Sequence, residues 1–291
     1  MALIALIAVT VVWGITFVQV KDAVDIYPLF AFLAVRYAIA TGVLGIAGAP
    51  RLRSLGRSGV AAGAFLGALL GIGIGLQTAG LQRTTVSSTG FITGLYVVLT
   101  PLFGLVLFRT RVGLQVWLGV VLSVTGLAML SGVHVGSTAG DLLVLASTSA
   151  QALQIVMVER YANRYDAIAL TLVEMATCCL GFFVIAVALG DLSVPHGWTV
   201  WGALLVTGIF ASALAYLIQV WAQQRMSAAR IALVFALETV WAGFFGFVLD
   251  GDRLGWLGWG GCAAILAGIV LAEPTAAKVL RRLAPDLLLS D

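Results

Sequence analysis

The chain has 291 residues, of which 61% are apolar and only 10% are charged, and its formal net charge is +3. A soluble protein carries about 25% charged residues, so this composition excludes an ordinary soluble domain and indicates a protein whose surface meets lipid. The positive charge is too small and too dispersed to indicate a nucleic-acid partner.

Ten apolar runs follow one another along the chain. Each has roughly the 20 residues that a helix needs to cross a hydrocarbon core of about 30 Å. The first run has no positively charged segment before it and extends over about a full membrane thickness, so we expect a transmembrane helix there and not a signal peptide. The loops are too short to hold a soluble domain. In chain order, the expected helices cover residues 3–20, 28–48, 59–81, 86–108, 112–131, 140–158, 167–189, 198–222, 229–249 and 254–272.

Lysine and arginine are distributed unevenly between the two sets of helix ends. Twelve lie at one set, three lie at the other, and Arg36 falls within a helix. Loops on the cytoplasmic side carry the excess of positive charge. We therefore expect a multi-pass protein of the inner or plasma cell membrane, with both termini and a basic tail over 274–291 in the cytoplasm. The twelve are Arg51, Arg53, Arg57, Arg109, Arg111, Arg160, Arg164, Arg225, Arg230, Lys278, Arg281 and Arg282, against Lys21, Arg83 and Arg253.

The chain also resembles itself. The pattern Arg-x-Gly-x3-Trp-x-Gly-x6-Gly begins at Arg111 and again at Arg253. Chance similarity among glycine-rich helices is the alternative, but five matched positions that include Arg and Trp argue against it. We therefore expect two repeats, over 1–131 and 139–273, with five helices each. Because five is odd, the second repeat would enter the membrane upside down, as in secondary transporters that bind substrate between two inverted halves.

Polar side chains recur at helical spacing on several of these helices. A polar stripe that faces lipid is costly, so we expect these faces to surround a central cavity. Bonding between neighbouring helices is the alternative, and we favour it for single Ser and Thr residues but not for the larger Gln and Tyr side chains. The expected substrate-binding residues are Trp13, Thr16, Thr78, Gln82, Thr93, Tyr96, Thr100, Gln151, Gln154, Tyr216, Gln219, Glu238 and Trp241.

Three ionisable residues fall well inside the expected helices, and such residues suggest a functional site. Glu238 would bind an ammonium group or carry a coupling proton; a structural carboxyl is an equally weighted alternative. Arg36 and Glu174 occupy equivalent places in the two repeats. For both we favour a structural role, either as an ion pair or through separate local bonds.

Several other classes of protein lack the residues that they need. The three cysteines lie in apolar runs and the two histidines in different loops, so we expect neither a metal site nor another cofactor. The motifs His-Glu-x-x-His and Gly-x-Ser-x-Gly are absent, and Asp166 and Asp191 flank opposite ends of one helix, so an intramembrane enzyme is not expected. No filter or charged ring indicates a channel.

The two five-helix repeats, with Thr110-Arg111 and Asp252-Arg253 each before a glycine-rich helix, resemble the EamA-type branch of the drug/metabolite transporter superfamily. The first repeat lacks the acid of the Glu-Arg pair that is common there, and Thr239 replaces an expected proline. The resemblance covers residues 3 to about 272. It implies a basket of ten helices around a central cavity and an export role, often for amino acids. Bacterial exporters of aromatic and other neutral amino acids are the most similar members.

We therefore expect an all-α integral membrane protein, a monomer, that exports small neutral metabolites, first of all aromatic or neutral amino acids, by alternating access. The alternative is a multidrug or lipophilic-cation exporter, because Glu174 and Glu238 would attract a cation and Trp13 and Trp241 would supply cation–π contacts. Phosphorylated solutes such as nucleotide sugars are disfavoured, since Arg36 is the only basic residue well inside a helix.

Overall fold

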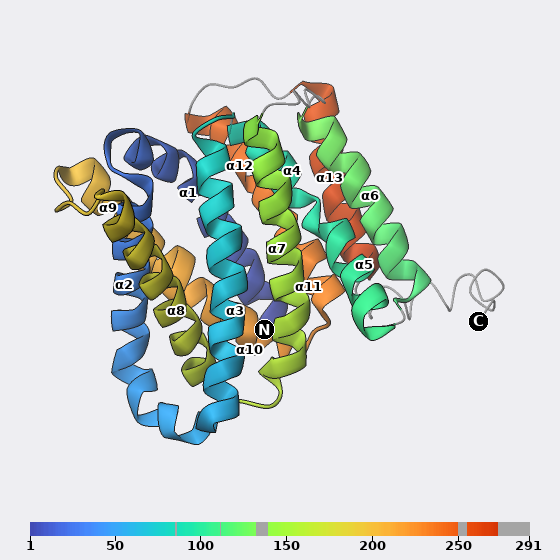
Figure 1. Cartoon of the computed structure of the whole chain (residues 1–291). Helices are drawn as coiled ribbons and strands as arrows, with labels where there is room; N and C mark the ends of the chain where they lie inside the picture. The colour runs from blue at the N-terminus through green and yellow to red at the C-terminus, as the bar shows by residue number, and fades with distance from the viewer. Residues whose placement is uncertain (85, 111, 132–138, 250–254, 273–291) are drawn as a thin grey trace.

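The computed structural model describes residues 1–84, 86–110, 112–131, 139–249 and 255–272. Regular structure in these ranges is entirely helical, and Figure 1 shows the helices side by side in one bundle. The expected tail over 274–291 lies outside the described residues, as do Arg111 and the Asp252-Arg253 pair. The helices are α1 (Ala2–Ile26), α2 (Leu29–Gly48), the short 3-10 helix η1 (Ala49–Arg51), α3 (Leu52–Leu81), α4 (Val86–Gly94), α5 (Tyr96–Phe108), α6 (Leu114–Ser131), α7 (Ala139–Ala162), α8 (Ala167–Leu189), α9 (Trp198–Gly208), the π-helical segment η2 (Ile209–Leu214), α10 (Ala215–Gln223), α11 (Ala228–Phe235), α12 (Leu237–Leu249) and α13 (Trp256–Ala272).

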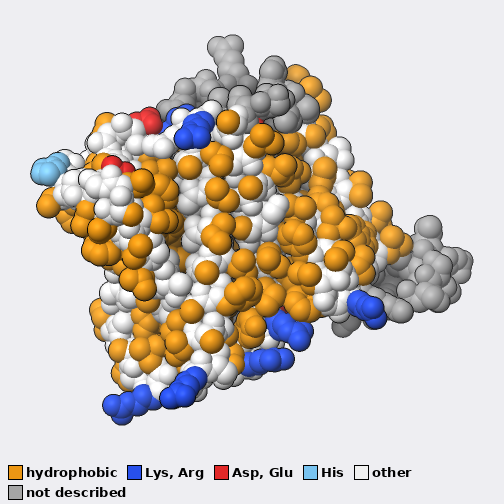
Figure 2. All heavy atoms as spheres, viewed as in Figure 1, with side chains coloured by type: hydrophobic (Ala, Val, Ile, Leu, Met, Phe, Trp, Pro, Cys, Tyr) orange, Lys and Arg blue, Asp and Glu red, His pale blue; other side chains and the backbone are white. Residues whose placement is uncertain are grey.

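The length and hydropathy of these helices confirm a membrane protein with many spans. Six helical stretches are long and apolar enough to cross a bilayer, and one of them, Leu29–Leu81, contains both α2 and α3. Shorter apolar stretches lie in α6 and α13. Large apolar side chains such as Ile46, Phe183 and Leu257 are exposed, and Figure 2 shows apolar atoms over the sides of the bundle. Lipid is the solvent in which such a surface is stable, since the helices satisfy their own backbone hydrogen bonds.

Three of the expected helices depart from regular α-helix within their length. The run over 86–108 breaks at Leu95, the run over 229–249 breaks at Ala236, and the run over 198–222 contains the π-helical segment η2. At Leu95 the amide donates to the carbonyl of Ile92, three residues back, which tightens the turn. Hydropathy could not reveal these breaks, because it reports apolar content and not backbone bonding. In α3, a kink at Gly56, where φ is 61°, separates a short helical turn that begins at Leu52 from the main part of the helix.

Helices from the two halves of the chain pack against each other in matched combinations. α6 lies along α13 and α2 along α8, and both pairs are side by side in Figure 1. In addition, α1 packs against α12 while α5 packs against α7. The core therefore runs between the two halves, and the main buried clusters draw residues from both.

The α6–α13 contact depends on glycine. A Cβ atom at Gly119 would lie 2.6 Å from the carbonyl oxygen of Gly268, and a Cβ atom at Gly268 would lie 2.6 Å from the carbonyl oxygen of Gly119. Gly126 approaches Gly261 in the same way. The two helices run antiparallel, because Gly119 meets Gly268 whereas Gly126, further along α6, meets the earlier Gly261 of α13. Small residues allow this close backbone approach.

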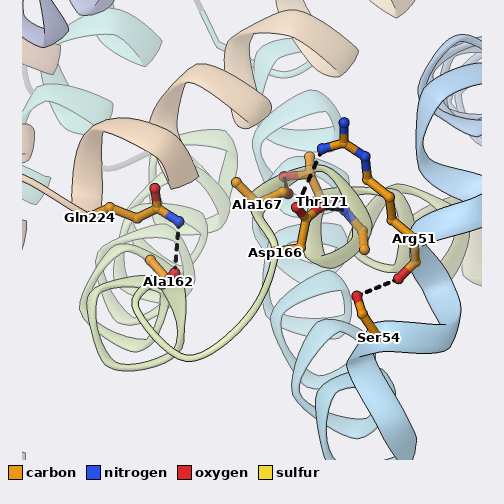
Figure 3. Close-up of polar contacts among 8 residues, drawn as sticks. Arg51, Ser54, Ala162, Asp166, Ala167, Thr171 and Gln224 are labelled. Carbon is orange, nitrogen blue, oxygen red and sulfur yellow. Dashed lines mark hydrogen bonds and ion pairs between the residues drawn. The ribbon is translucent and has the colours of Figure 1, made fainter.

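One end of the bundle carries most of the visible positive charge. Figure 2 shows the Lys and Arg side chains of this face mainly at the lower end, where Figure 1 places η1 and the α7–α8 turn. Figure 3 shows how helix ends are tied together there. The carboxylate of Asp166 accepts hydrogen bonds from the amide of Ala169 at 3.0 Å and from Nη1 of Arg51 at 3.4 Å. The side-chain amide of Gln224 donates to the carbonyl of Ala162 at 3.0 Å.

Asp166 should matter for stability because it caps α8, and its ion pair should matter less. We expect Asp166→Ala to cost about 1 kcal/mol, the usual value of an N-cap. Arg51→Gln should cost at most about half of that, because the Arg51 side chain is 50% exposed and solvent screens the pair. Thermal unfolding of the detergent-solubilised variants measures both effects. An equal loss for the two variants would show that the ion pair, and not the cap, is the main contribution.

Candidate functional site: a central polar cavity

A cavity opens in the middle of the bundle, between helices from both halves of the chain. The empty space amounts to about 700 Å³ when the open solvent at its mouth is included. Its wall combines aromatic rings, amides, hydroxyls, one arginine and one glutamate, a mixture typical of sites for small organic ligands. The lining residues are Trp13, Thr16, Phe17, Val20, Arg36, Leu70, Ile74, Gln77, Thr78, Leu81, Tyr96, Gln151, Gln154, Ile155, Tyr216, Gln219, Phe235 and Glu238.

The structure brings most of the expected substrate-binding residues together in this cavity. The polar faces predicted from helical spacing do turn inward. The expected residues that line the cavity are Trp13, Thr16, Thr78, Tyr96, Gln151, Gln154, Tyr216, Gln219 and Glu238.

Four expected residues lie away from the cavity. Thr93 is one layer behind the wall, where its hydroxyl accepts a hydrogen bond from Gln77 at 2.9 Å. Gln82, at the end of α3, donates to the carbonyl of Val24. Thr100 lines a second cavity together with Glu159. Trp241 packs against Phe244 and Phe245, with ring centroids 6.1 and 6.4 Å away. Helical spacing defines a face along the whole helix, whereas the cavity occupies only part of that length.

Two polar residues of the wall, Arg36 and Gln77, are absent from the expected set. Gln77 precedes Thr78 on α3, so the face assigned to that helix was too narrow. From the sequence we favour a structural role for Arg36. The signal that could have found it is its rarity, because an arginine within a membrane-spanning helix usually faces a cavity or a partner.

Aromatic rings form a continuous wall across the cavity. Trp13 lies at its centre, 5.7 Å from the ring of Tyr216 and 4.8 Å from that of Phe235. The ring of Tyr96 lies 6.2 Å beyond Phe235 in an edge-on contact. The indole N–H of Trp13 donates to the carbonyl of Ala211 in η2 at 2.9 Å, which fixes the ring. The wall is therefore a preformed surface for an apolar or aromatic group.

A chain of hydrogen-bonded amides begins at the cavity wall, at Gln154 and Gln219. The amide nitrogen of Gln219 donates to the side-chain oxygens of Gln154 at 3.0 Å and Gln223 at 3.1 Å. Gln154 in turn donates to Oε1 of Glu174 at 2.7 Å, and Gln223 donates to the carbonyl of Ile155. Gln154 and Gln219 thus line the cavity and also bond to neighbouring helices. Both roles considered for these glutamines, cavity lining and bonding between helices, therefore apply.

Arg36 and Glu174 do not pair with each other. Nε of Arg36 donates to the hydroxyl of Ser212 at 2.8 Å, while Glu174 is held by Gln154. An ion pair is formed elsewhere in the described part of the chain, between Arg51 and Asp166. Of the two structural alternatives, separate local bonds are therefore the one observed.

Glu238 lies where the two broken helices meet. It follows the break at Ala236, and Tyr96 follows the break at Leu95. The phenol of Tyr96 donates to Oε2 of Glu238 at 3.3 Å. These two residues are 142 positions apart, the same shift that relates the repeated motifs. The contact thus joins two residues that are separated by the shift of the repeated motifs.

Nothing in the described parts of the chain groups three or more His, Cys, Asp or Glu side chains as a metal site would require. The cavity instead offers fixed hydrogen-bonding groups beside an aromatic surface. A membrane-spanning helical bundle with such a cavity is typical of proteins that bind a small solute within the membrane.

The chain belongs to the EamA-like transporter family, whose sequence model matches residues 1–132 and again 138–272. This confirms the resemblance to the EamA-type branch and makes the protein a membrane transporter of a small-molecule solute. It is 28% identical over 273 residues to an uncharacterized transporter of Archaeoglobus fulgidus, covering 93% of this chain and 85% of the relative. A solved structure described as "Crystal structure of protein" has the same fold, with a TM-score of 0.77 and 19% identity over 96% of this chain and 98% of that one.

Proposed function

We propose that this transporter exports small neutral metabolites, first of all aromatic and neutral amino acids, by alternating access across the cell membrane. The observation that carries the proposal is the cavity itself, in which the Arg36 guanidinium and the Glu238 carboxyl lie beside the Trp13 wall. A zwitterion with an apolar side chain needs those three surfaces. The side-chain amides of the wall add neutral hydrogen-bonding groups for such a solute, and the amide nitrogen of each also donates to a neighbouring residue.

Alternating access is supported by signs of two inverted repeats, over 1–131 and 139–273. Tyr96 and Glu238 are separated by the shift of the repeated motifs and contact each other, which supports an axis between them that relates the halves. By the shift of the repeated motifs, Gly119 corresponds to Gly261 and Gly126 corresponds to Gly268. In the structure, Gly119 meets Gly268 and Gly126 meets Gly261. Both arrangements are what a two-fold axis in the membrane plane produces. Rocking of one half against the other around a fixed midplane site follows from that symmetry.

The multidrug alternative is weaker in light of the cavity. A lipophilic cation would be drawn to Glu238 and the aromatic wall, but Arg36 faces the same space and would repel it. Glu174 and Trp241, which the alternative also requires, do not line the cavity.

The orientation with both termini in the cytoplasm rests on the distribution of basic residues. It is checked by single cysteines introduced at opposite ends, at the exposed Ser54 (Ser54→Cys) and the partly exposed Asp191 (Asp191→Cys), with an impermeant thiol reagent added to intact cells. Asp191→Cys should react and Ser54→Cys should not, over the background of the unmodified chain. The reverse pattern would invert the assignment.

Transport by the purified protein in liposomes tests the function. We expect saturable uptake of radiolabelled phenylalanine and of other neutral amino acids, and weaker or no uptake of acidic ones. Empty liposomes and an excess of unlabelled solute are the controls. Uptake of tetraphenylphosphonium without that of any amino acid would replace the proposal with the multidrug alternative.

A further inference from the structure

The guanidinium of Arg36 faces the cavity with its terminal nitrogens unused. Only Nε has a recorded hydrogen bond, to the Ser212 hydroxyl, and this bond fixes the plane of the head group. Arg36 as a whole is only 7% exposed. Neither of its terminal nitrogens, however, is a fully buried atom without a hydrogen-bond partner. Both therefore reach the open space of the cavity that Arg36 lines.

No acid within the described residues neutralises this cation. Glu174 bonds to Gln154 and Glu238 to Tyr96, and neither lies within ion-pair distance of Arg36. The ring of Tyr37 lies 5.6 Å from Cζ, which supplies only a weak contact. A buried charge without a partner is costly, so the arrangement is expected where a ligand supplies the opposite charge.

We propose that Arg36 binds the carboxylate of the transported solute through the two terminal nitrogens of its guanidinium. This rests on the proposed function and deepens it. A carboxylate presents two oxygens that match two parallel N–H donors, a geometry that lysine cannot reproduce. The carboxylate of Glu238 faces the same cavity, so a solute with further negative charge, such as a phosphate ester, is disfavoured.

The position of Arg36 also orients the rest of the solute. Its anchor, Ser212, lies four residues before Tyr216, whose ring begins the aromatic wall. Residues four apart lie on the same face of a helix. A solute whose carboxylate is bound at Arg36 would thus lay its side chain against Tyr216 and Trp13.

The experiment compares two probes that differ at the carboxylate alone. In proteoliposomes, unlabelled L-phenylalanine and L-phenylalaninamide compete with labelled phenylalanine, and the ratio of their inhibition constants is measured. This ratio does not depend on how much protein is active. We expect the unmodified chain to prefer the carboxylate at least tenfold, which corresponds to about 1.4 kcal/mol. Arg36→Gln should bring the ratio close to one, and Arg36→Lys should leave an intermediate value. The matched control Arg57→Gln, which removes an exposed arginine at the end of the bundle, should keep the full preference.

The possible failures are distinguishable. If the unmodified chain does not transport phenylalanine, the proposed function fails. If it does and Arg36→Gln keeps the full preference, the function stands and the role of Arg36 is refuted. Should Arg36→Gln not fold, as judged by size-exclusion chromatography, Arg36→Lys decides in its place: a lowered ratio supports the proposal and an unchanged ratio refutes it. Stronger inhibition by the phosphonate analogue of phenylalanine than by phenylalanine would overturn the carboxylate assignment.

Discussion

Glu238→Gln should lower kcat/KM for phenylalanine transport at least tenfold while the protein stays folded. The loss follows from replacing a carboxylate by a neutral amide opposite the ammonium group of the solute, since charge-assisted hydrogen bonds are about twice as strong as neutral ones. The amide oxygen can still accept the hydrogen bond from Tyr96, so the meeting point of α5 and α12 is preserved. Initial rates in proteoliposomes measure the effect, and an unchanged melting temperature confirms the fold.

A matched control and a second assay separate the roles open to Glu238. Asp25→Asn removes an exposed carboxylate near the end of α1 and should transport normally. If Glu238 binds the ammonium group, Glu238→Gln slows both gradient-driven uptake and exchange of labelled for unlabelled solute. If Glu238 carries a coupling proton instead, exchange survives and only the response to a pH gradient is lost. Normal rates in both assays would leave Glu238 a structural carboxyl.

Gly126→Ala should destabilise the protein by about 1–3 kcal/mol, although it adds a single methyl group. The added Cβ would lie 2.5 Å from the carbonyl oxygen of Gly261 and 2.8 Å from Cγ1 of Ile265. A backbone oxygen cannot rotate away as a side chain can, so α6 and α13 must separate, and overpacking of this kind costs about 1–3 kcal/mol. Because these helices pack closely along their length, the loss should appear as a lower melting temperature in detergent.

Gly42→Ala is the matched control, because a Cβ atom at Gly42 in α2 meets nothing within 4 Å. Alanine has a better helix propensity than glycine by about 1 kcal/mol, so this variant should melt at the same temperature or higher. Equal melting temperatures for the Gly126 and Gly42 variants would show that the α6–α13 crossing is not as close as the structure has it. A transport defect without a change in stability would point instead to movement between these helices during the cycle.

The amino-acid sequence by itself determined the class of protein and the positions of most of its helices. Hydropathy summed over a membrane thickness does not depend on which helices later become neighbours, so the runs at 28–48 and 167–189 correspond closely to α2 and α8. The inward faces of Gln151, Gln154 and Tyr216 were predictable for a related reason, since a polar stripe is as costly in lipid on one helix as on another.

The tertiary structure alone decided how those helices meet. Arg36 reaches Ser212, 176 residues away, and Tyr96 reaches Glu238; neither contact has a signal in local spacing. The breaks at Leu95 and Ala236 are likewise invisible to hydropathy, because they change backbone bonding without changing apolar content. Periodicity shows which face of a helix is polar, but the depth of the cavity along that face is set by packing against helices distant in the chain. For that reason Thr100 and Gln82 lie beyond the cavity, whereas Arg36 lies within its wall.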